Sequence, residues 1–234
     1  MVDRGLIIDG VRLSDKNLYY ATIPPVPTPE QDVEYVEIRG RHGELTKKYG
    51  YKNIPYTLKL YFHEDAIFRQ EFRKVKPFLL NAKKLIFVED SEVYYKVKSA
   101  QINTADSVVY KYGEFEVDFT LDPFMYEYTN PKQEITESIT FLNRGFEAQP
   151  IITAHCTGTG NVYVNDKKIT IKNVNGTITI DSEMMNAYRK ADGFITNLNN
   201  HMIGDFPVLV QGNNTVSFDG AISKLEIIKN ARWV

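Results

Sequence analysis

The sequence of 234 residues contains a single cysteine, Cys156, so no disulfide can form within the chain. This scarcity suits a protein made in a reducing compartment. No apolar run approaches the roughly 20 residues that a membrane-spanning helix requires. The opening MVDRGLIIDGVRLSDK has only one short apolar run, Leu6 to Ile8, and does not read as a secretory signal. We therefore expect synthesis in the cytosol, with no exported form and no membrane insertion.

The chain also lacks an excess of charge of either sign. Lys and Arg total 28 and Asp and Glu total 30, which gives a net charge of −2. Nucleic acids and anionic membranes select a basic face, so the composition predicts no nucleic-acid readout. Aromatic residues are abundant, with 15 Tyr and 13 Phe. Such residues favour β-strands and surfaces that become buried in an assembly.

Patterns for catalysis and metal binding are missing too. The histidines His42, His63, His155 and His201 lie far apart, without metal-ligand spacing to cysteine or carboxylates. There is no nucleophile elbow, no P-loop and no dinucleotide-binding glycine motif. The glycines of residues 157–161, TGTGN, lie between two predicted strands, which indicates a strand-to-strand turn and not a phosphate cradle. The sequence predicts no catalytic residue, no cofactor and no metal site.

The first half of the chain reads as strands with one helix, an antiparallel α+β domain. Residues 5–13 predict a hairpin around Asp9-Gly10, and the proline-rich residues 24–30 predict a loop. Further strands are expected at 18–23, 33–40, 54–62, 83–90 and 94–103. Phe115, Val117, Phe119 and Leu121 alternate with polar residues, which is typical of a half-buried strand; Asp122-Pro123 should end it.

One helix is predicted within residues 63–81. Phe68, Phe72, Val75 and Leu79 recur on a single helical face. The acidic Glu64 and Asp65 favour the first turn through the helix dipole, and Pro77 should kink or shorten the end. Residues 41–51, RHGELTKKYGY, are polar and lie between two apolar strands, which predicts a long hairpin arm.

Residues 128–134, YTNPKQE, form the best candidate linker, which predicts domains at 1–130 and 131–234. Beyond it the chain reads as short strands without a convincing helix, and residues 184–193 are expected to be loop or strand. The breaks between these strands carry turn-forming residues: Asn165-Asp166, Asn175-Gly176, Asn213-Asn214 and Asp219-Gly220. Short strands at regular spacing predict a β-sandwich or jelly roll. The expected fold class is therefore mainly β with one helix.

Several segments together resemble the distal tail (Dit) proteins of long-tailed, non-contractile phages and prophages of Gram-positive bacteria. In the first half these are EIRGRHGEL, residues 37–45, and VDFTLDPFMY, residues 117–126. In the second half they are residues 143–171 and IGDFPVLVQGNNTVSF, residues 203–218, with Gly145, Pro150, Gly160, Asp181, Phe206-Pro207 and Gly212-Asn213. His42 departs from the family pattern, where Asp is frequent. The resemblance spans nearly the whole chain.

The resemblance implies assembly and not catalysis. Such proteins have an N-terminal domain that forms a ring, usually of six copies, at the end of the tail tube, followed by a galectin-like β-sandwich. The ring joins the tube to tip proteins, so the implied partners are further copies and the tail-tube, tape-measure, tail-tip or tail-lysin and receptor-binding proteins. The implied location is the virion tail tip, after synthesis in the host bacterial cytoplasm. The short chain looks like the form without inserted carbohydrate-binding modules.

Two other functions stay open at this level. A carbohydrate-binding adhesion module of the bacterial wall would use exposed aromatic residues, for which Tyr163, Tyr188 and Trp233 are the candidates. An enzyme such as a wall hydrolase is the more distant alternative. For a ring-forming protein we expect the arm to supply subunit contacts, with Arg39, Arg41, Glu44 and Tyr49 as interface candidates. The alternative for the arm is a surface hairpin without a partner.

Overall fold

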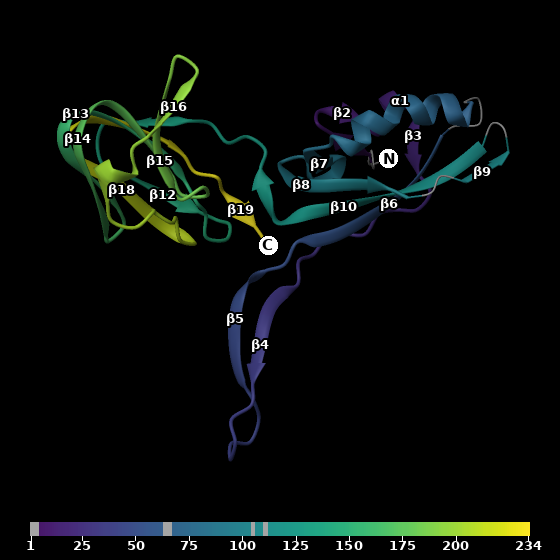
Figure 1. Cartoon of the computed structure of the whole chain (residues 1–234), viewed down its shortest axis with the longest axis horizontal. Helices are drawn as coiled ribbons and strands as arrows, with labels where there is room; N and C mark the ends of the chain where they lie inside the picture. Colours follow the sequence, from purple (N-terminus) through teal and green to yellow (C-terminus); the bar gives the residue numbers. More distant parts are fainter. Residues whose placement is uncertain (1–4, 63–66, 104–105, 110–111) are drawn as a thin grey trace. The chain divides into compact units, whose positions relative to one another are not determined.

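The protein is described by a computed structural model that covers residues 5–62, 67–103, 106–109 and 112–234. The chain forms two compact units, divided in the sequence between Tyr128 and Thr129 (Figure 1). Both units are built from antiparallel strands, and one α-helix occurs among the described residues. The expected fold class, mainly β with one helix, is confirmed.

The main sheet of the first unit is antiparallel with the strand order β2-β1-β7-β8-β10-β6-β3, and β9 also pairs with β10. Its predicted first turn is confirmed: Asp9 and Gly10 link β1 and β2 with φ of 50° and 83°, the conformation that a two-residue hairpin requires. Two short 3-10 helices also occur. The elements are β1 (Leu6–Ile8), β2 (Val11–Arg12), η1 (Leu13–Lys16), β3 (Leu18–Tyr20), β6 (Ile54–Phe62), β7 (Lys84–Phe87), η2 (Val88–Asp90), β8 (Val93–Ile102), β9 (Asp106–Val109) and β10 (Tyr112–Glu127).

The helix α1 (Phe68–Leu80) presents the predicted apolar face to the sheet. Phe68, Val75 and Leu79 are buried, and Phe72 packs partly buried against the same core. Pro77 does not end the helix, which continues to Leu80. Proline lacks the N–H that would donate to the carbonyl four residues earlier, and its ring crowds that carbonyl, so the buried contacts of Val75 and Leu79 offset a cost at this position. His63, Glu64 and Asp65, the last two expected in the first turn, lie outside the described residues.

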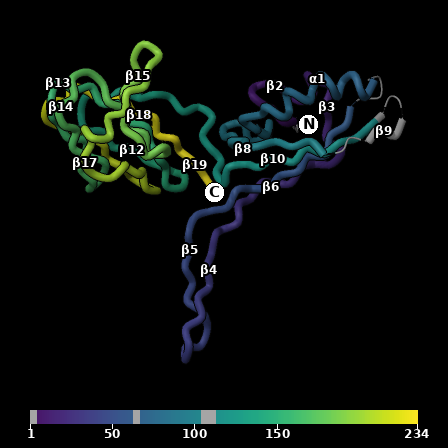
Figure 2. Tube along the Cα trace, in the orientation of Figure 1, coloured from purple at the N-terminus to yellow at the C-terminus, as the bar shows by residue number. Residues whose placement is uncertain are grey.

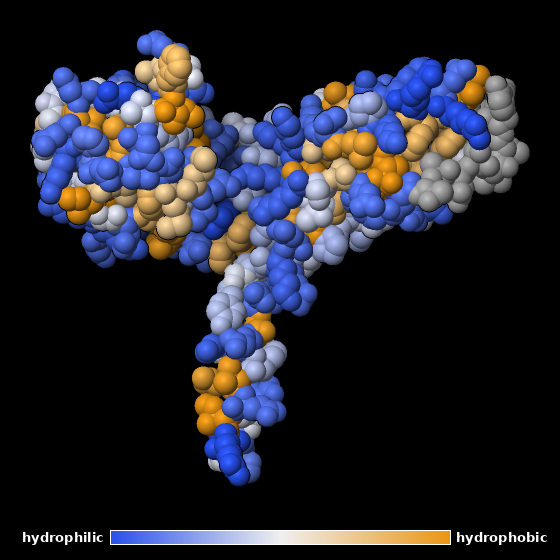
Figure 3. Space-filling view, viewed as in Figure 1, coloured by the Kyte–Doolittle hydropathy of each residue, from blue (hydrophilic) through white to orange (hydrophobic). Residues whose placement is uncertain are grey.

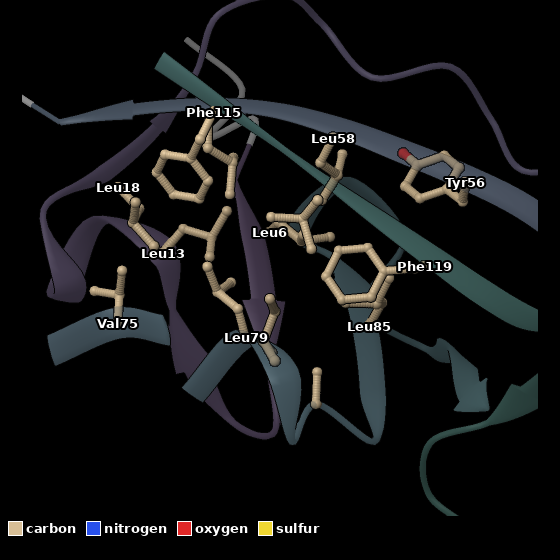
Figure 4. Close-up of a cluster of buried hydrophobic side chains, with 14 of the residues drawn as sticks. Leu6, Leu13, Leu18, Tyr56, Leu58, Val75, Leu79, Leu85, Phe115 and Phe119 are labelled. Atoms are coloured by element: carbon tan, nitrogen blue, oxygen red, sulfur yellow. The ribbon is translucent and has the colours of Figure 1, made fainter. Parts of the chain in front are cut away.

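The core of the first unit lies between α1 and the sheet, and Phe115 of β10 is one of its side chains (Figure 4). Phe115 is 2% exposed, and its ring centroid lies 5.0 Å from that of Phe72 and 5.7 Å from that of Phe62. Figure 4 shows Leu13, Leu18 and Val75 pointing into the same space. Edge-to-face and tilted rings at these separations add favourable electrostatics to the buried apolar area. Aromatic contacts therefore hold the helix to the sheet together with the buried Val75 and Leu79.

The predicted alternation along β10 is confirmed, but its predicted end is wrong. Phe115, Val117, Phe119 and Leu121 are all buried. The strand continues past Asp122-Pro123 to Glu127, with a register shift against β8 between Leu121 and Met125. A bulge leaves Pro123 outside the ladder, so the missing proline N–H is not needed there. The Asp122 carboxylate accepts from the Tyr126 hydroxyl at 2.9 Å and faces the Lys98 ammonium at 3.2 Å.

Substitution of Phe115 by Ala should destabilise the first unit by about 3–5 kcal/mol, because it removes a buried ring and leaves a cavity. Denaturant unfolding followed by circular dichroism measures the loss. The control is Tyr35→Ala: the Tyr35 side chain is 63% exposed, so a change within about 0.5 kcal/mol is expected. Equal effects of the two substitutions would contradict the assignment of Phe115 to the core.

The second unit contains one antiparallel sheet with the strand order β11-β18-β13-β14-β15-β16, to which β12 adds at β18 and β17 at β14. A single apolar core includes residues from both halves of the long strands, among them Ile152, Val162 and Leu225. Its elements are β11 (Gln133–Ile135), β12 (Ile139–Asn143), β13 (Ile151–Val164), β14 (Lys167–Asp181), β15 (Asn186–Ala191), β16 (Phe194–Asn197), η3 (Asn199–His201), β17 (Met202–Ile203), β18 (Gly212–Ile228) and β19 (Arg232–Trp233).

The predicted short strands of this unit are wrong in length, since three long strands continue through predicted breaks. The TGTGN segment lies inside β13, Asn175-Gly176 inside β14 and Asp219-Gly220 inside β18. Register shifts interrupt β13 between Gly158 and Gly160. Glycine inside a strand marks a bulge or bend as readily as a turn, so the residue types alone misled the prediction. Of the four predicted turns, Asn165-Asp166 does connect two strands, β13 and β14.

The bend depends on glycine because β13 and β18 come very close together there. A Cβ atom on Gly160 would lie 2.7 Å from the Asp219 carbonyl oxygen, and one on Gly220 would lie 2.8 Å from the Gly160 Cα. Backbone atoms cannot move aside as flexible side-chain ends do. Only glycine at both positions lets the two strands bend together and turn both of their halves toward one core.

Substitution of Gly160 by Ala should therefore destabilise the second unit by about 1–3 kcal/mol through overpacking. The thermal midpoint of the protein measures it. A Cβ atom on Gly50 meets nothing within 4 Å, so Gly50→Ala is the matched control and should change stability little. A fully stable Gly160→Ala protein would show that the strands can separate at this bend.

The predicted turn at Asn213-Asn214 lies at the start of β18 instead. Asn214 is completely buried, and its carboxamide accepts from the Val210 N–H at 2.9 Å and donates to the Val210 carbonyl oxygen at 2.8 Å. Asn165 donates to the same carboxamide oxygen at 3.0 Å. A buried amide with all these partners stabilises the loop that precedes the strand. The residues 212–214 are thus structural, with no ligand required to explain them.

Candidate interaction surface

Residues 31–51 form a two-stranded ribbon, called the arm below. It consists of β4 (Gln31–Val36), β5 (Leu45–Tyr51) and a tip, residues 37–44. The two strands pair antiparallel, with Val36 opposite Leu45 and Glu34 opposite Lys47. Figures 1 and 2 show them side by side, with no other strand of the unit alongside.

The arm is longer than the sequence predicted. A strand was expected at 33–40 as a boundary of the arm, but β4 ends at Val36 and is itself half of the arm. The chain turns through Gly40 and Gly43, whose φ angles are 87° and 75°. These left-handed positions suit glycine and keep residues 37–44 out of the ladder.

The arm buries almost none of its side chains. Every residue from 37 to 50 is exposed. The exposed apolar residues of the arm include Tyr35 at 63%, Tyr49 at 56%, Ile38 at 45% and Leu45 at 39% exposure. Figure 3 shows apolar residues along the arm among polar ones. An isolated two-stranded ribbon is only marginally stable in water, and exposed apolar residues gathered on it are typical of a surface that another chain covers.

The root of the arm is anchored to the first unit. The Tyr51 ring lies edge-on to Phe124 with centroids 5.9 Å apart, and the Lys52 N–H donates to the Glu30 carbonyl oxygen at 2.8 Å. The preceding proline-rich loop receives two tyrosine hydroxyls: Tyr56 donates to the Pro25 carbonyl at 3.1 Å and Tyr95 to the Pro27 carbonyl at 3.3 Å. These contacts hold the root, whereas residues 37–44 of the tip are exposed.

Burial raises the pKa of both tyrosine hydroxyls that bind the proline-rich loop. It raises the pKa of Tyr95 to about 12, with the nearby Asp90 charge adding to the effect. Burial raises the pKa of Tyr56 as well. Both groups therefore remain protonated donors throughout the neutral range.

Polar contacts across the arm fix its register. The Tyr49 hydroxyl donates to the Glu34 carboxylate at 2.6 Å, which raises the pKa of Tyr49, and the Lys47 ammonium lies 3.8 Å from the same carboxylate. Lys52 faces Glu30 at 3.2 Å. All these groups are exposed to solvent, so each contact contributes little to stability. They favour one pairing of β4 with β5 without making the arm a folded unit of its own.

All four predicted interface residues lie on the arm. Arg39, Arg41 and Glu44 are in the exposed tip, and Tyr49 is on β5. Tyr49 is already bound to Glu34, so its ring, and not its hydroxyl, is the part open to a partner. The sequence prediction missed Tyr35, Ile38 and Leu45. Tyr35 and Ile38 had been assigned to the strand before the arm, and Leu45 is an apolar residue within the segment that was described as polar.

Other candidate sites receive less support from the geometry. Among the described residues, no group of three or more His, Cys, Asp or Glu side chains is placed to hold a metal ion. The described helix is neither long nor apolar enough to cross a membrane. The three candidate sugar-binding aromatics, Tyr163, Tyr188 and Trp233, are partly buried on three different strands. The Tyr163 hydroxyl is bound to Asp219 at 2.8 Å.

Comparison with known proteins was informative only at the level of structure. No family model matches the sequence, and no curated protein does. The chain is similar in structure to the SPP1 Dit (gp 19.1) protein, a hub of the adsorption apparatus in phages that infect Gram-positive bacteria, with a TM-score of 0.64 and 14% identity. This match covers 98% of the present chain and 99% of the other.

The chain is also similar to structures of the phage P2 baseplate in its activated conformation. With Ca the TM-score is 0.51 and with Sr it is 0.50, both at 11% identity. The matches cover 99% and 96% of the present chain, and 98% and 96% of the others. At such identities the likeness shows the fold. The Dit-like fold expected from the sequence is confirmed, while the galectin-like character of the second unit stays a prediction.

Limited trypsin digestion of the isolated subunit should cut first within the arm, at Arg39, Arg41, Lys47 or Lys48. These residues are exposed on a ribbon with few tertiary contacts, so local opening is easiest there. Mass spectrometry of the early fragments identifies the sites. First cuts within β13 or β18 would contradict this ranking of local stability.

Proposed function

We propose that the protein is a distal tail protein of a phage or prophage, a structural component that forms a ring, of about six copies, between the tail tube and the tip. The observation that carries this proposal is the likeness to the SPP1 Dit hub, which extends over 98% of the chain. Since a shared fold alone does not assign a function, the arm adds a second argument from the molecule itself.

The arm fits a subunit that closes a ring. A ring joins two different patches on each subunit, one receiving what the other presents. The arm is a patch of this kind, because another chain would bury the apolar side chains that the arm exposes. These side chains are Tyr35, Ile38, Leu45 and Tyr49. Arg39, Arg41, Glu44 and Tyr49 are the interface residues of this proposal.

The partners follow from the proposed place at the end of the tail. They are the tail-tube and tape-measure proteins on one side, and tail-tip or tail-lysin and receptor-binding proteins on the other. The site of action is the virion tail tip, after synthesis in the cytoplasm of the bacterial host. No catalytic step belongs to this role, in which contacts between chains perform the function.

Negative-stain microscopy of the concentrated protein tests the ring. Particles with cyclic symmetry and about six subunits are expected. Because assembly follows mass action, the protein is examined over a wide range of concentrations, with analytical ultracentrifugation alongside. A protein that stays monomeric throughout and binds cell-wall polysaccharide would replace this proposal with the carbohydrate-binding adhesion module.

Charge reversal at the tip tests the interface. Arg41→Glu should raise the concentration at which half of the protein is assembled by about threefold or more, since it places the wrong charge at each subunit contact. Lys190→Glu, an equal charge change on exposed β15, is the control and should leave assembly unchanged. If Arg41→Glu assembles as the original protein does, Arg41 lies outside the interface.

A further inference from the structure

Both edges of the arm are open. Within the described residues, β4 and β5 hydrogen-bond in a ladder only with each other, so each strand has one side without a neighbouring strand. Every second residue on such a side directs its backbone N–H and C=O away from the ribbon. Open edges of this kind are templates for pairing with another chain.

The two edges carry opposite charge. The β4 side carries Asp32 and Glu34, and the β5 side carries Lys47 and Lys48, all of them exposed. The same separation extends to the root, where Glu30 precedes β4 and Lys52 follows β5. The whole chain has a net charge of only −2, so this segregation is a local feature of the arm.

Two arms can pair through their edges in three ways, and the charges on the edges favour one of the three. Joining β4 to β4 sets carboxylates against carboxylates, and joining β5 to β5 sets ammonium groups against each other. Like charges on opposing strands are unfavourable, whereas opposite charges stabilise the pair. Joining β5 of one arm to β4 of the next brings Lys47 beside carboxylates, because Lys47 and Glu34 share one face of the ribbon, while Lys48, opposite Val33, lies on the other face. Repeated around a ring, it also leaves no edge open.

Cyclic symmetry supplies the strand direction for this pairing. The pairing takes each arm to lie along the ring axis, and rotation about the axis leaves the direction of such an arm unchanged. Since β4 and β5 run antiparallel, β5 of one copy and β4 of the next then also run antiparallel. The contact is heterologous, which is the type that closes rings.

We propose that the arms of neighbouring copies join edge to edge, with the basic β5 of one copy paired antiparallel to the acidic β4 of the next. The occupant of each open edge is thus a second copy of this chain. This inference rests on the ring proposed above and specifies its contact. In the continuous sheet that results, Tyr35 and Tyr49 gain cross-strand neighbours in place of solvent.

Two variants with matched charges test this pairing. In the acidic-arm variant, Lys47→Glu and Lys48→Glu make both edges negative; in the basic-arm variant, Asp32→Lys and Glu34→Lys make both edges positive. Each variant alone should need a protein concentration on the order of tenfold higher to assemble, because like charges then face each other at every contact between arms. An equimolar mixture should regain rings at nearly the original concentration, with the two variants alternating.

The mixture separates contacts between copies from effects within one arm. Mixing does not change the contacts within each arm, including the altered Glu34–Lys47 pair. Recovery of ring assembly therefore reports only on the contact between β5 of one copy and β4 of the next. A third variant carries all four substitutions, which restores opposite charges both within and between arms, and it should assemble alone. Circular dichroism and sedimentation of the dilute proteins check that all variants are folded.

The outcomes distinguish the pairing from the ring itself. If the original protein never forms rings, the proposed function fails and the pairing with it. If the original protein forms rings and each variant alone does so equally well, the ring stands and the edge pairing is wrong. The pairing is also overturned if the mixture assembles no better than its components, which is the result expected if the arm docks on the body of its neighbour.

Discussion

The pairing of β10 with β6 and β8 is the interaction on which the first unit depends. β10 lies between these two strands, and its buried side places Phe115, Val117, Phe119 and Leu121 in the core beneath α1. β6 is paired with β10 from Ile54 to Tyr61, and it begins only three residues after β5 ends at Tyr51. The central ladder therefore also fixes where the arm leaves the sheet.

This connection explains how an element with no core of its own can keep a defined root. The tyrosines that hold the proline-rich loop, Tyr56 and Tyr95, come from β6 and β8, the two partners of β10. Their buried hydroxyls donate to loop carbonyls, which gives those backbone groups the partners that burial requires. Stability is concentrated in the sheet, and the arm is left exposed for contact with another chain.

The second unit differs, since both halves of its long strands must contribute to one core. Gly160 and Gly220 allow β13 and β18 to bend while their backbones remain in close approach. The buried amide of Asn214 then secures the loop that enters β18. These are internal requirements of the fold, so Gly160, Gly220 and Asn214 have structural explanations.

Elements with strong periodicity were predictable because their pattern depends on local geometry. The face of α1 and the alternation along β10 follow from the repeats of a helix and a strand, and the Asp9-Gly10 turn follows from backbone conformation. Boundaries were less predictable. Pro123, Gly160 and Gly220 were interpreted as ends of strands, whereas neighbouring strands accommodate each of them in a bulge or bend.

The candidate interface shows the same division. From the sequence alone came a polar hairpin between apolar strands and the charges at Arg39, Arg41 and Glu44. Tertiary structure was needed to show that β4 belongs to this hairpin, that Tyr35, Ile38 and Leu45 are left exposed, and that acidic and basic residues lie on opposite edges. Composition and periodicity are properties of one segment, and they determined the element types. Exposure and edge identity depend on which strands find partners elsewhere in the chain, so only the folded structure decided them.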